Sequence, residues 1–270
     1  MPTLQDETFL RIAELMRDRV GMSLAASKKP LVSSRLASRI QKLGLDGYEE
    51  YLALISERSD ADEFQVAVDL LTTNETYFFR EPHHYALLER ELAGTVRRPL
   101  SVWSAAASFG DEAYSIAMLL SDMQLKGRIG SEWSILATDI SDRVLRAASE
   151  AVYPQERLRN VSPEQLKRYC LRGEGESEGM VQMHPRLRER VRFGWLNLCQ
   201  PIEDLGPFDV IFLRNVLIYF DASTKREVVD RVMTQLRPGG VFFAGTAEGR
   251  VPCGTPLKPL GPGAFRKVSG

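Results

Sequence analysis

Three strand-like segments that each end in polar residues constrain the fold of this chain more than any other feature. They run from Ser101 to Glu112, from Ile135 to Asp139 and from Pro207 to Phe220. Helical patterns separate them, and this alternation of strands and helices predicts a parallel α/β sheet. Because ligands bind outside the carboxyl ends of the strands in such a sheet, the polar residues predict a binding cleft at that edge.

The loop that follows the first of these strands indicates which ligand the cleft binds. Its side chains from Ala105 to Gly110 are small apart from Phe109, so its backbone can approach a ligand closely. A dinucleotide site would need the pattern G-x-G-x-x-G, but here one glycine is followed by Asp111 and Glu112. Two acids suit the ammonium or sulfonium of S-adenosylmethionine, and Asp139 suits its ribose hydroxyls. Each acid alone could simply start a helix or a turn, whereas together they favour this cofactor.

The composition is that of a soluble globular protein. The 270 residues are 44% hydrophobic and 26% charged, and they suffice for one large and one small domain. A net charge of −1 gives no overall field that would attract nucleic acid. Three scattered cysteines without C-x-x-C spacing predict reduced thiols, and we expect no metal site. Without a signal peptide or a long apolar run, the chain is expected to be cytoplasmic and not inserted in a membrane.

The hydrophobic periodicity divides the chain into two predicted domains. Residues 1–75 have apolar residues at helical spacing and predict an all-helical domain. The basic stripe and the family resemblance described below make it the candidate substrate-docking domain. Residues 76–270 carry the alternating pattern of a Rossmann-like methyltransferase sheet. Within them, residues from about 165 to 195 contain short apolar runs between glycines, at 166–171, 180–183 and 191–193. This segment predicts a small antiparallel β insertion built on hairpins.

Two longer blocks of the sequence are specific enough to point to one family. They read L-L-T-T-N-E-T-Y-F-F-R-E from Leu70 and R-N-V-L-I-Y-F-D from Arg214. With the loop at 104–115, the block at 137–140 and the L-R-P-G-G block at 236–240, they follow the order found in bacterial chemotaxis receptor methyltransferases. The chain therefore resembles this family, the CheR family, over nearly its whole length.

The resemblance implies a protein-glutamate O-methyltransferase that acts in chemotaxis. Such an enzyme transfers a methyl group from S-adenosylmethionine to glutamate carboxylates on the cytoplasmic helical bundle of chemoreceptors, and it releases S-adenosylhomocysteine. A glutamate with the usual pKa of about 4.3 is already ionised near neutral pH, so no general base is needed. We accordingly expect His83 and His84, next to Pro82, to cap or pack a helix.

The resemblance also implies roles for individual residues. Arg80 and Tyr219 are the predicted catalytic residues, because a cation and a hydroxyl can hold the acceptor carboxylate in line with the methyl group. The predicted cofactor-binding residues are Asn74, Thr76 and Arg80 at the methionine end, Glu112 at the amino group, Asp139 at the ribose, Asn197 and Leu198 at the adenine, and Asn215 and Val216 closing the pocket. The family's G-H-S-E motif is Gly245-Thr-Ala-Glu248 here, which puts a histidine role at that point in doubt.

A basic stripe is the candidate for substrate docking. Between Lys28 and Lys42 there are five basic residues and no acid, and Arg35, Arg39 and Lys42 share one predicted helix face. Such a stripe is usually a solvated surface, but opposite an acidic receptor helix it favours docking. The insertion resembles the family's β-subdomain, which in some members binds a pentapeptide at the receptor C-terminus. Whether it does so here is left open, and we expect a monomer without a nucleic-acid partner.

Two other function classes use the same cofactor. An S-adenosylmethionine-dependent RNA methyltransferase could have the same sheet, but the N-P-P-Y or D-P-P-Y motif of amino-group methylation is absent, and Pro252-Cys253 is a faint match to a pyrimidine methyltransferase nucleophile. A non-enzymatic sensor that only binds the donor is the other alternative, and the presence of Arg80 and Tyr219 counts against it.

Overall fold

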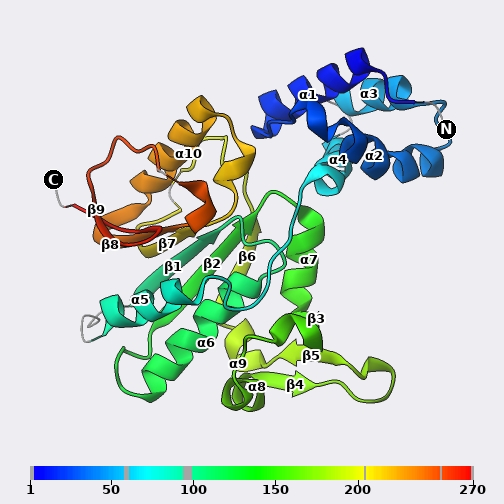
Figure 1. The fold of residues 1–270 in the computed structure, drawn as a ribbon. Helices are drawn as coiled ribbons and strands as arrows, with labels where there is room; N and C mark the ends of the chain where they lie inside the picture. The colour runs from blue at the N-terminus through cyan, green and yellow to red at the C-terminus, as the bar shows by residue number, and fades with distance from the viewer. Residues whose placement is uncertain (1–2, 58–60, 94–98, 204, 250, 269–270) are drawn as a thin grey trace.

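The computed structural model describes residues 3–57, 61–93, 99–203, 205–249 and 251–268. A helical region and a small three-stranded sheet lie at opposite ends of the molecule, with a seven-stranded sheet between them (Figure 1). This confirms the predicted fold class of an α/β sheet with an all-helical N-terminal part and a small antiparallel sheet. Within the described ranges, no helix is both long and apolar enough to span a lipid bilayer.

Four helices form the helical region, namely α1 (Asp6–Val20), α2 (Lys29–Leu43), α3 (Tyr48–Ser56) and α4 (Ala61–Leu71). Apolar residues recur along each helix at helical spacing, so each buries one face. These faces share one core, which includes Ile12, Leu36 and Tyr51. The helical region thus has an apolar core of its own, apart from the cores on the sheet.

The central sheet has the strand order β6-β2-β1-β7-β8-β10-β9. Its strands are β1 (Leu100–Ala105), β2 (Trp133–Asp139), β6 (Val191–Trp195), β7 (Phe208–Leu213), β8 (Leu236–Ala244), β9 (Leu257–Gly261) and β10 (Ala264–Lys267). The first five run parallel, while β10 is antiparallel to β8 and β9. The chain order reverses on either side of β1, since β2 lies on one side and β7 on the other. Ligands bind at such a reversal.

Helices cover both faces of this sheet, so its strands are apolar on both sides. One face carries α5 (Pro82–Leu92) and α6 (Asp111–Leu125), and its core includes Val102, Phe212 and Phe243. The other face carries α10 (Ala222–Thr234), and its core includes Trp103 and Phe242. A further helix, α7 (Asp142–Glu150), follows β2. Neighbouring residues of a strand pack into different cores, as Val102 and Trp103 do. This alternation fixes the register of the strands and so the positions of their ends.

The small sheet differs in detail from the predicted insertion. It consists of β3 (Val152–Pro154), β4 (Cys170–Arg172) and β5 (Met180–Met183), all antiparallel in the order β3-β5-β4, with α8 (Pro163–Tyr169) and α9 (Pro185–Arg188) beside it. The run at 191–193, expected in the insertion, instead lies in β6 and pairs parallel with β2. Most of the run at 166–171 is the helix α8. Short apolar runs do not reveal their partner strand, and that is the reason for both differences.

The helical region contacts the loops at the sheet edge through hydrogen bonds that involve backbone groups. The Asn197 amide donates from Nδ2 to the Arg19 carbonyl at 2.9 Å, and the Ser23 backbone N–H donates to the Tyr219 carbonyl at 2.8 Å. Between them Gly21 has a φ of 73°, and a Cβ there would lie 2.3 Å from Cys199 Sγ. Glycine is therefore needed for both the conformation and the close approach.

Candidate active site

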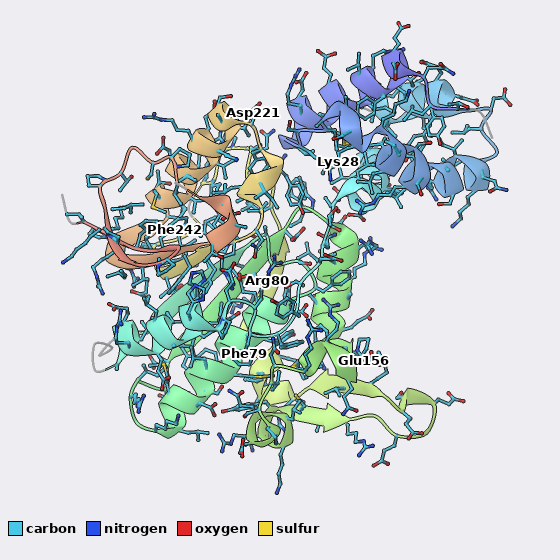
Figure 2. The ribbon with its side chains drawn as sticks, in the orientation of Figure 1. Lys28, Phe79, Arg80, Glu156, Asp221 and Phe242 are labelled. Carbon is cyan, nitrogen blue, oxygen red and sulfur yellow. The ribbon has the colours of Figure 1, made fainter. Side chains whose placement is uncertain are left out.

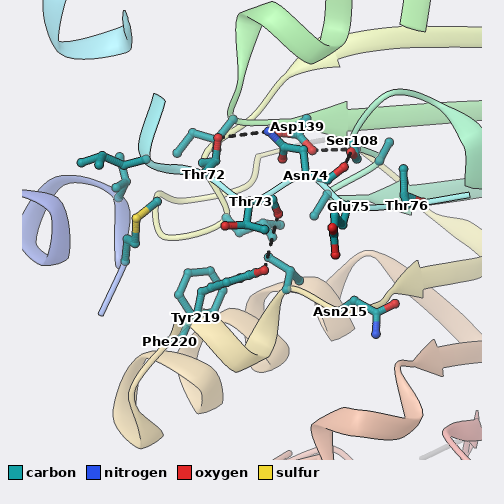
Figure 3. Close-up of a pocket in the computed structure, with 18 of the residues that line it drawn as sticks. Thr72, Thr73, Asn74, Glu75, Thr76, Ser108, Asp139, Asn215, Tyr219 and Phe220 are labelled. Atoms are coloured by element: carbon teal, nitrogen blue, oxygen red, sulfur yellow. Dashed lines mark hydrogen bonds between the residues drawn. The ribbon is translucent and has the colours of Figure 1, made fainter. Parts of the chain in front are cut away.

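A pocket opens between the helical region and the carboxyl ends of β1, β2 and β7 (Figure 3). It holds about 1310 Å³ of empty space, counting the open solvent at its mouth, which is ample for a nucleoside joined to an amino acid. Tyr219 lines it, and so do all nine predicted cofactor-binding residues, namely Asn74, Thr76, Arg80, Glu112, Asp139, Asn197, Leu198, Asn215 and Val216.

The small-residue loop after β1 forms one wall of the pocket in an unusual backbone conformation. Ala106 and Ser108 have φ values of 60° and 51°, in the left-handed region that residues with a Cβ rarely adopt. The loop is held by the Ala107 N–H, which donates to the Thr138 carbonyl at 2.9 Å, and by Ser108 Oγ, which donates to the Asn74 carbonyl at 3.0 Å (Figure 3). Backbone strain of this kind persists only where the surrounding contacts hold it in place, and such positions are common at binding sites.

Asp139 ends β2 as a buried carboxylate. Oδ2 accepts the Ser108 backbone N–H at 2.8 Å, and Oδ1 accepts that of Ser141 at 3.0 Å. Burial raises the pKa of Asp139, while these two backbone amides act in the opposite direction. Each carboxylate oxygen retains a second acceptor position. The side chain is thus held rigidly on the pocket wall with capacity to accept hydrogen bonds from a ligand.

Glu112 is held by Arg214, which belongs to the R-N-V-L-I-Y-F-D block but had no role predicted from the sequence. Arg214 Nη1 donates to Glu112 Oε2 at 2.9 Å and Nη2 donates to Glu81 Oε2 at 3.1 Å, while Ser104 Oγ donates to the other Glu112 oxygen at 2.7 Å. Burial raises the pKa of Glu112, and Arg214 opposes this shift. The sequence did contain a sign of this role, because Arg214 directly follows the apolar strand β7. A cation at such a position is rarely buried without an acidic partner.

The two predicted catalytic residues lie on different elements that face the same pocket. Arg80 Nη1 donates to the Glu75 carbonyl at 3.0 Å, and the side chain is partly exposed in the centre of the molecule (Figure 2). The Tyr219 hydroxyl donates to the Thr73 carbonyl at 3.4 Å (Figure 3). Tyr219 was expected at the end of a buried strand, but β7 ends at Leu213 and Tyr219 belongs to the one-turn 3₁₀ helix Leu217–Tyr219.

Several of the remaining pocket residues use their polar groups within the protein. Asn74 Nδ2 donates to Thr72 Oγ1 at 3.1 Å. Asn197 is 5% exposed, and besides its bond to Arg19 its Oδ1 accepts the Cys199 N–H at 2.9 Å. Asn215 has a φ of 60°, so it turns the chain sharply between β7 and the 3₁₀ helix. These residues shape the pocket wall at the points where segments distant in sequence meet.

Glu248 is a further residue at the site whose role sequence analysis missed. Its Oε1 accepts the N–H groups of Val216 and Leu217, both at 2.8 Å, and its Oε2 accepts that of Gly245 at 2.8 Å. It thereby fixes the segment that carries Val216 and Tyr219. Thr246, which stands where the family has histidine, donates its Oγ1 to Glu81 Oε1 at 2.9 Å.

The acids at the start of α6 do not act as the pair that the sequence suggested. Asp111 is fully buried and outside the residues that line the pocket, and it accepts from Arg157 Nη2 at 2.8 Å. Burial raises its pKa to about 6, against the attraction of Arg157. Consecutive helix residues point about 100° apart, so Asp111 and Glu112 serve different sites.

The basic stripe on α2 lies outside the pocket, and its two arginines are engaged within the helical region. Arg35 Nη1 donates to the Leu71 carbonyl at 2.8 Å, at the end of α4. Arg39 Nε donates to Glu63 at 3.0 Å, and the Glu63 side chain is only 7% exposed. Lys42 is exposed. Two of the three members of the stripe thus hold α2 against α4, and the role of the stripe in substrate docking stays a prediction.

The pocket has the polar groups that S-adenosylmethionine requires. A small-residue loop lets backbone approach the ligand, Asp139 provides fixed acceptors at a strand end, and Glu112 offers a carboxylate to a cation. Lys28, at the end of the 3₁₀ turn Ala26–Lys28, lines the pocket and lies on the side of the helical region that faces the sheet (Figure 2). A mouth with cations such as Lys28 and Arg80 suits an acidic acceptor.

Comparisons with known proteins agree with this chemistry. Residues 7–72 match the family described as "CheR methyltransferase, all-alpha domain", and residues 74–253 match "CheR methyltransferase, SAM binding domain". The chain is 43% identical to a chemotaxis protein methyltransferase of Escherichia coli K12, covering 91% of this chain and 85% of the relative. It is 41% identical to chemotaxis protein methyltransferase 2 of Pseudomonas aeruginosa, covering 90% and 86%.

A solved structure is similar at a greater distance. The glycopeptide N-methyltransferase MtfA, solved in complex with sinefungin, is 15% identical and has a TM-score of 0.38, covering 76% of this chain and 68% of that protein. A likeness this remote supports no conclusion about the site.

Proposed function

Because the chain belongs to the CheR family of chemotaxis protein methyltransferases, we propose that its pocket holds S-adenosylmethionine and presents a receptor glutamate to the methyl group. The chain is an S-adenosylmethionine-dependent protein-glutamate O-methyltransferase, and its substrates are chemoreceptors. Membership of this family excludes the RNA methyltransferase and the non-enzymatic sensor as alternatives. The proposal concerns which residues bind the donor and the acceptor.

The donor lies along the strand ends. Asp139 accepts the ribose hydroxyls with the acceptor positions that Ser108 and Ser141 leave free, and Glu112 receives the amino group of the methionine end. Asn197 and Leu198 flank the adenine, while Asn74, Thr76, Asn215 and Val216 form the walls. The observation that carries this proposal is that one pocket brings together all of these residues from separate segments.

The acceptor carboxylate enters beside Arg80 and Tyr219. S-Adenosylmethionine supplies a methyl group on a positively charged sulfur, from which a carboxylate oxygen can displace it. Arg80 attracts the glutamate carboxylate, and the Tyr219 hydroxyl orients it by a hydrogen bond, so that the oxygen and the methyl carbon are in line. Since the acceptor is already ionised, no proton has to move, and the products are the methyl ester and the neutral thioether.

Receptor docking involves the helical region, and we place it on the exposed cations of that region. Lys28 lines the pocket mouth and Lys42 is exposed on α2, while Arg35 and Arg39 keep α2 in position for the receptor helix. The edge strand β4, with Leu171 43% exposed, is where a receptor C-terminal peptide could add a strand. The cytoplasmic bundle of the receptor would then be the substrate, and the enzyme would act in the cytoplasm.

One labelling experiment tests this division. The enzyme is incubated with methyl-labelled S-adenosylmethionine and a receptor cytoplasmic fragment, and a fragment with its methylated glutamates changed to glutamine serves as the control. We expect base-labile label on the first fragment only, and nearly none with Arg80→Ala. Full labelling by Arg80→Ala would remove that residue from the acceptor site.

A further inference from the structure

A cluster of potential metal ligands lies at the start of α5, and the methyl-transfer chemistry does not use it. Glu81, His83 and His84 each offer a ligand atom, and these atoms all lie within 4.8 Å of one another. The chain has only three histidines, and two of them are in this cluster. From the sequence, both were expected to cap or pack a helix.

His84 is oriented as a metal-binding histidine usually is. The side chain is fully buried, and its Nε2 lies 2.9 Å from the Pro262 carbonyl, to which it must donate its hydrogen. Nδ1 is then left with a lone pair, and it has no hydrogen-bond partner among the described residues. Histidines that bind metals typically donate the other ring N–H to a backbone carbonyl in this way, which fixes the tautomer.

Nδ1 of His84 faces a second electron donor. Glu81 Oε2 lies 3.2 Å away, so the unpartnered Nδ1 and a carboxylate oxygen lie side by side. A cation other than a proton would satisfy both atoms.

Glu81 and His83 are the other two potential metal ligands of the cluster. Glu81 is held in place by two donors, since its Oε2 accepts from Arg214 Nη2 at 3.1 Å and its Oε1 accepts from Thr246 Oγ1 at 2.9 Å. Its φ of 58° is a rare conformation for a residue with a side chain, of the kind found at ligand sites. His83 is exposed to solvent, and its ring centroid lies 4.3 Å from that of the buried His84.

We propose that Glu81, His83 and His84 bind a divalent transition metal such as Zn²⁺, with water completing the coordination. Two imidazoles and one carboxylate are a ligand set that this class of metal prefers. The bound metal competes with Arg214 for Glu81 Oε2, 3.1 Å from Arg214 Nη2. Arg214 released from Glu81 would pair more fully with Glu112, which weakens the attraction of Glu112 for the donor's amino group. Metal binding is therefore inhibitory.

Calorimetric titration of the full chain with Zn²⁺ tests the site directly. His83→Ala removes an exposed ligand without disturbing the core, and His184→Ala removes the histidine outside the cluster as a matched control. We expect the wild type and His184→Ala to bind one equivalent, and His83→Ala to bind at least about 100-fold more weakly, since even outer partners of a metal site are worth 10- to 100-fold. Equal Zn²⁺ affinity in His83→Ala, or no saturable binding in the wild type, overturns the proposal.

The link to the pocket has its own readout, which does not depend on turnover. The affinity for S-adenosylhomocysteine is measured with and without saturating Zn²⁺. We expect Zn²⁺ to weaken this affinity several-fold in the wild type and in His184→Ala, and to leave it unchanged in His83→Ala. An affinity that Zn²⁺ does not alter in the wild type, or alters equally in His83→Ala, overturns inhibition through Arg214.

Discussion

The strand-end edge of the sheet and the basic face of α2 both carry charged residues whose spacing suggested binding, yet they differ in what those charges do. At the sheet edge, Asp139 and Glu112 are held by internal partners but still face a pocket. On α2, Arg35 and Arg39 direct their charges to α4. A strand that ends at an open edge leaves its last residues facing a cleft, whereas a helix face can be covered by a neighbouring helix.

The strongest test of this contrast is Arg214→Ala, which leaves Glu112 and Glu81 without their buried cation. Removing one partner of a buried ion pair costs about 3–5 kcal/mol of unfolding free energy, and we expect donor affinity to fall as well. Denaturant unfolding and calorimetry with S-adenosylhomocysteine measure both effects. Arg226→Ala, which breaks the exposed pair with Asp230, is the control and should change little.

On the basic face, Arg39→Ala should act on stability rather than on the cofactor. It leaves Glu63 buried with Tyr51 as a remaining donor at 2.9 Å, so we expect a loss of about 2–3 kcal/mol, somewhat below the usual range for a broken buried pair. Donor affinity should stay at the wild-type value. Lys42→Ala is the control, with unchanged stability. A stable Arg39→Ala enzyme that fails only with receptor would restore the stripe as a docking surface.

Asp139→Ala tests the opposite case, a charge that serves the ligand. Losing a hydrogen-bonded carboxylate costs about 1.5–3 kcal/mol, so binding of S-adenosylmethionine should weaken roughly 10- to 150-fold. Calorimetry measures it, with Asp142→Ala, outside the pocket lining, as the control. Unchanged affinity in Asp139→Ala would remove this residue from the proposed ribose site.

Tyr219→Phe should have the smallest energetic effect, because it removes one hydroxyl and keeps the ring. An orienting hydrogen bond is worth about 1 kcal/mol or somewhat more in a site without water, and we expect turnover to fall roughly 5- to 100-fold. The affinity for S-adenosylhomocysteine should hardly change. Single-turnover methylation of the receptor fragment separates the two quantities. Full turnover would leave Tyr219 as a wall residue, with the acceptor positioned by Arg80.

Local pattern predicted the fold class well, because helical spacing and strand alternation are properties of short segments. The four N-terminal helices and the parallel strands before and after the insertion follow from it. The pairing of strands could not be predicted from local pattern. Strand β6 shows why, because nothing in its apolar run at 191–193 indicates whether β2 or β5 is its neighbour. The small sheet was therefore predicted in kind but not in its membership.

The site divides in the same way between sequence and structure. Motifs alone indicated the methyl donor, the reaction and the candidate residues, whose individual roles remain predictions. Tertiary structure decided that Arg214 holds Glu112, that Asp111 turns away to Arg157, and that Arg39 is used to neutralise Glu63. The physical reason is that the partner of a buried charge comes from a segment distant in sequence, 102 residues away for Arg214 and Glu112. A motif identifies the charged residue, but only the tertiary structure shows which groups that residue contacts.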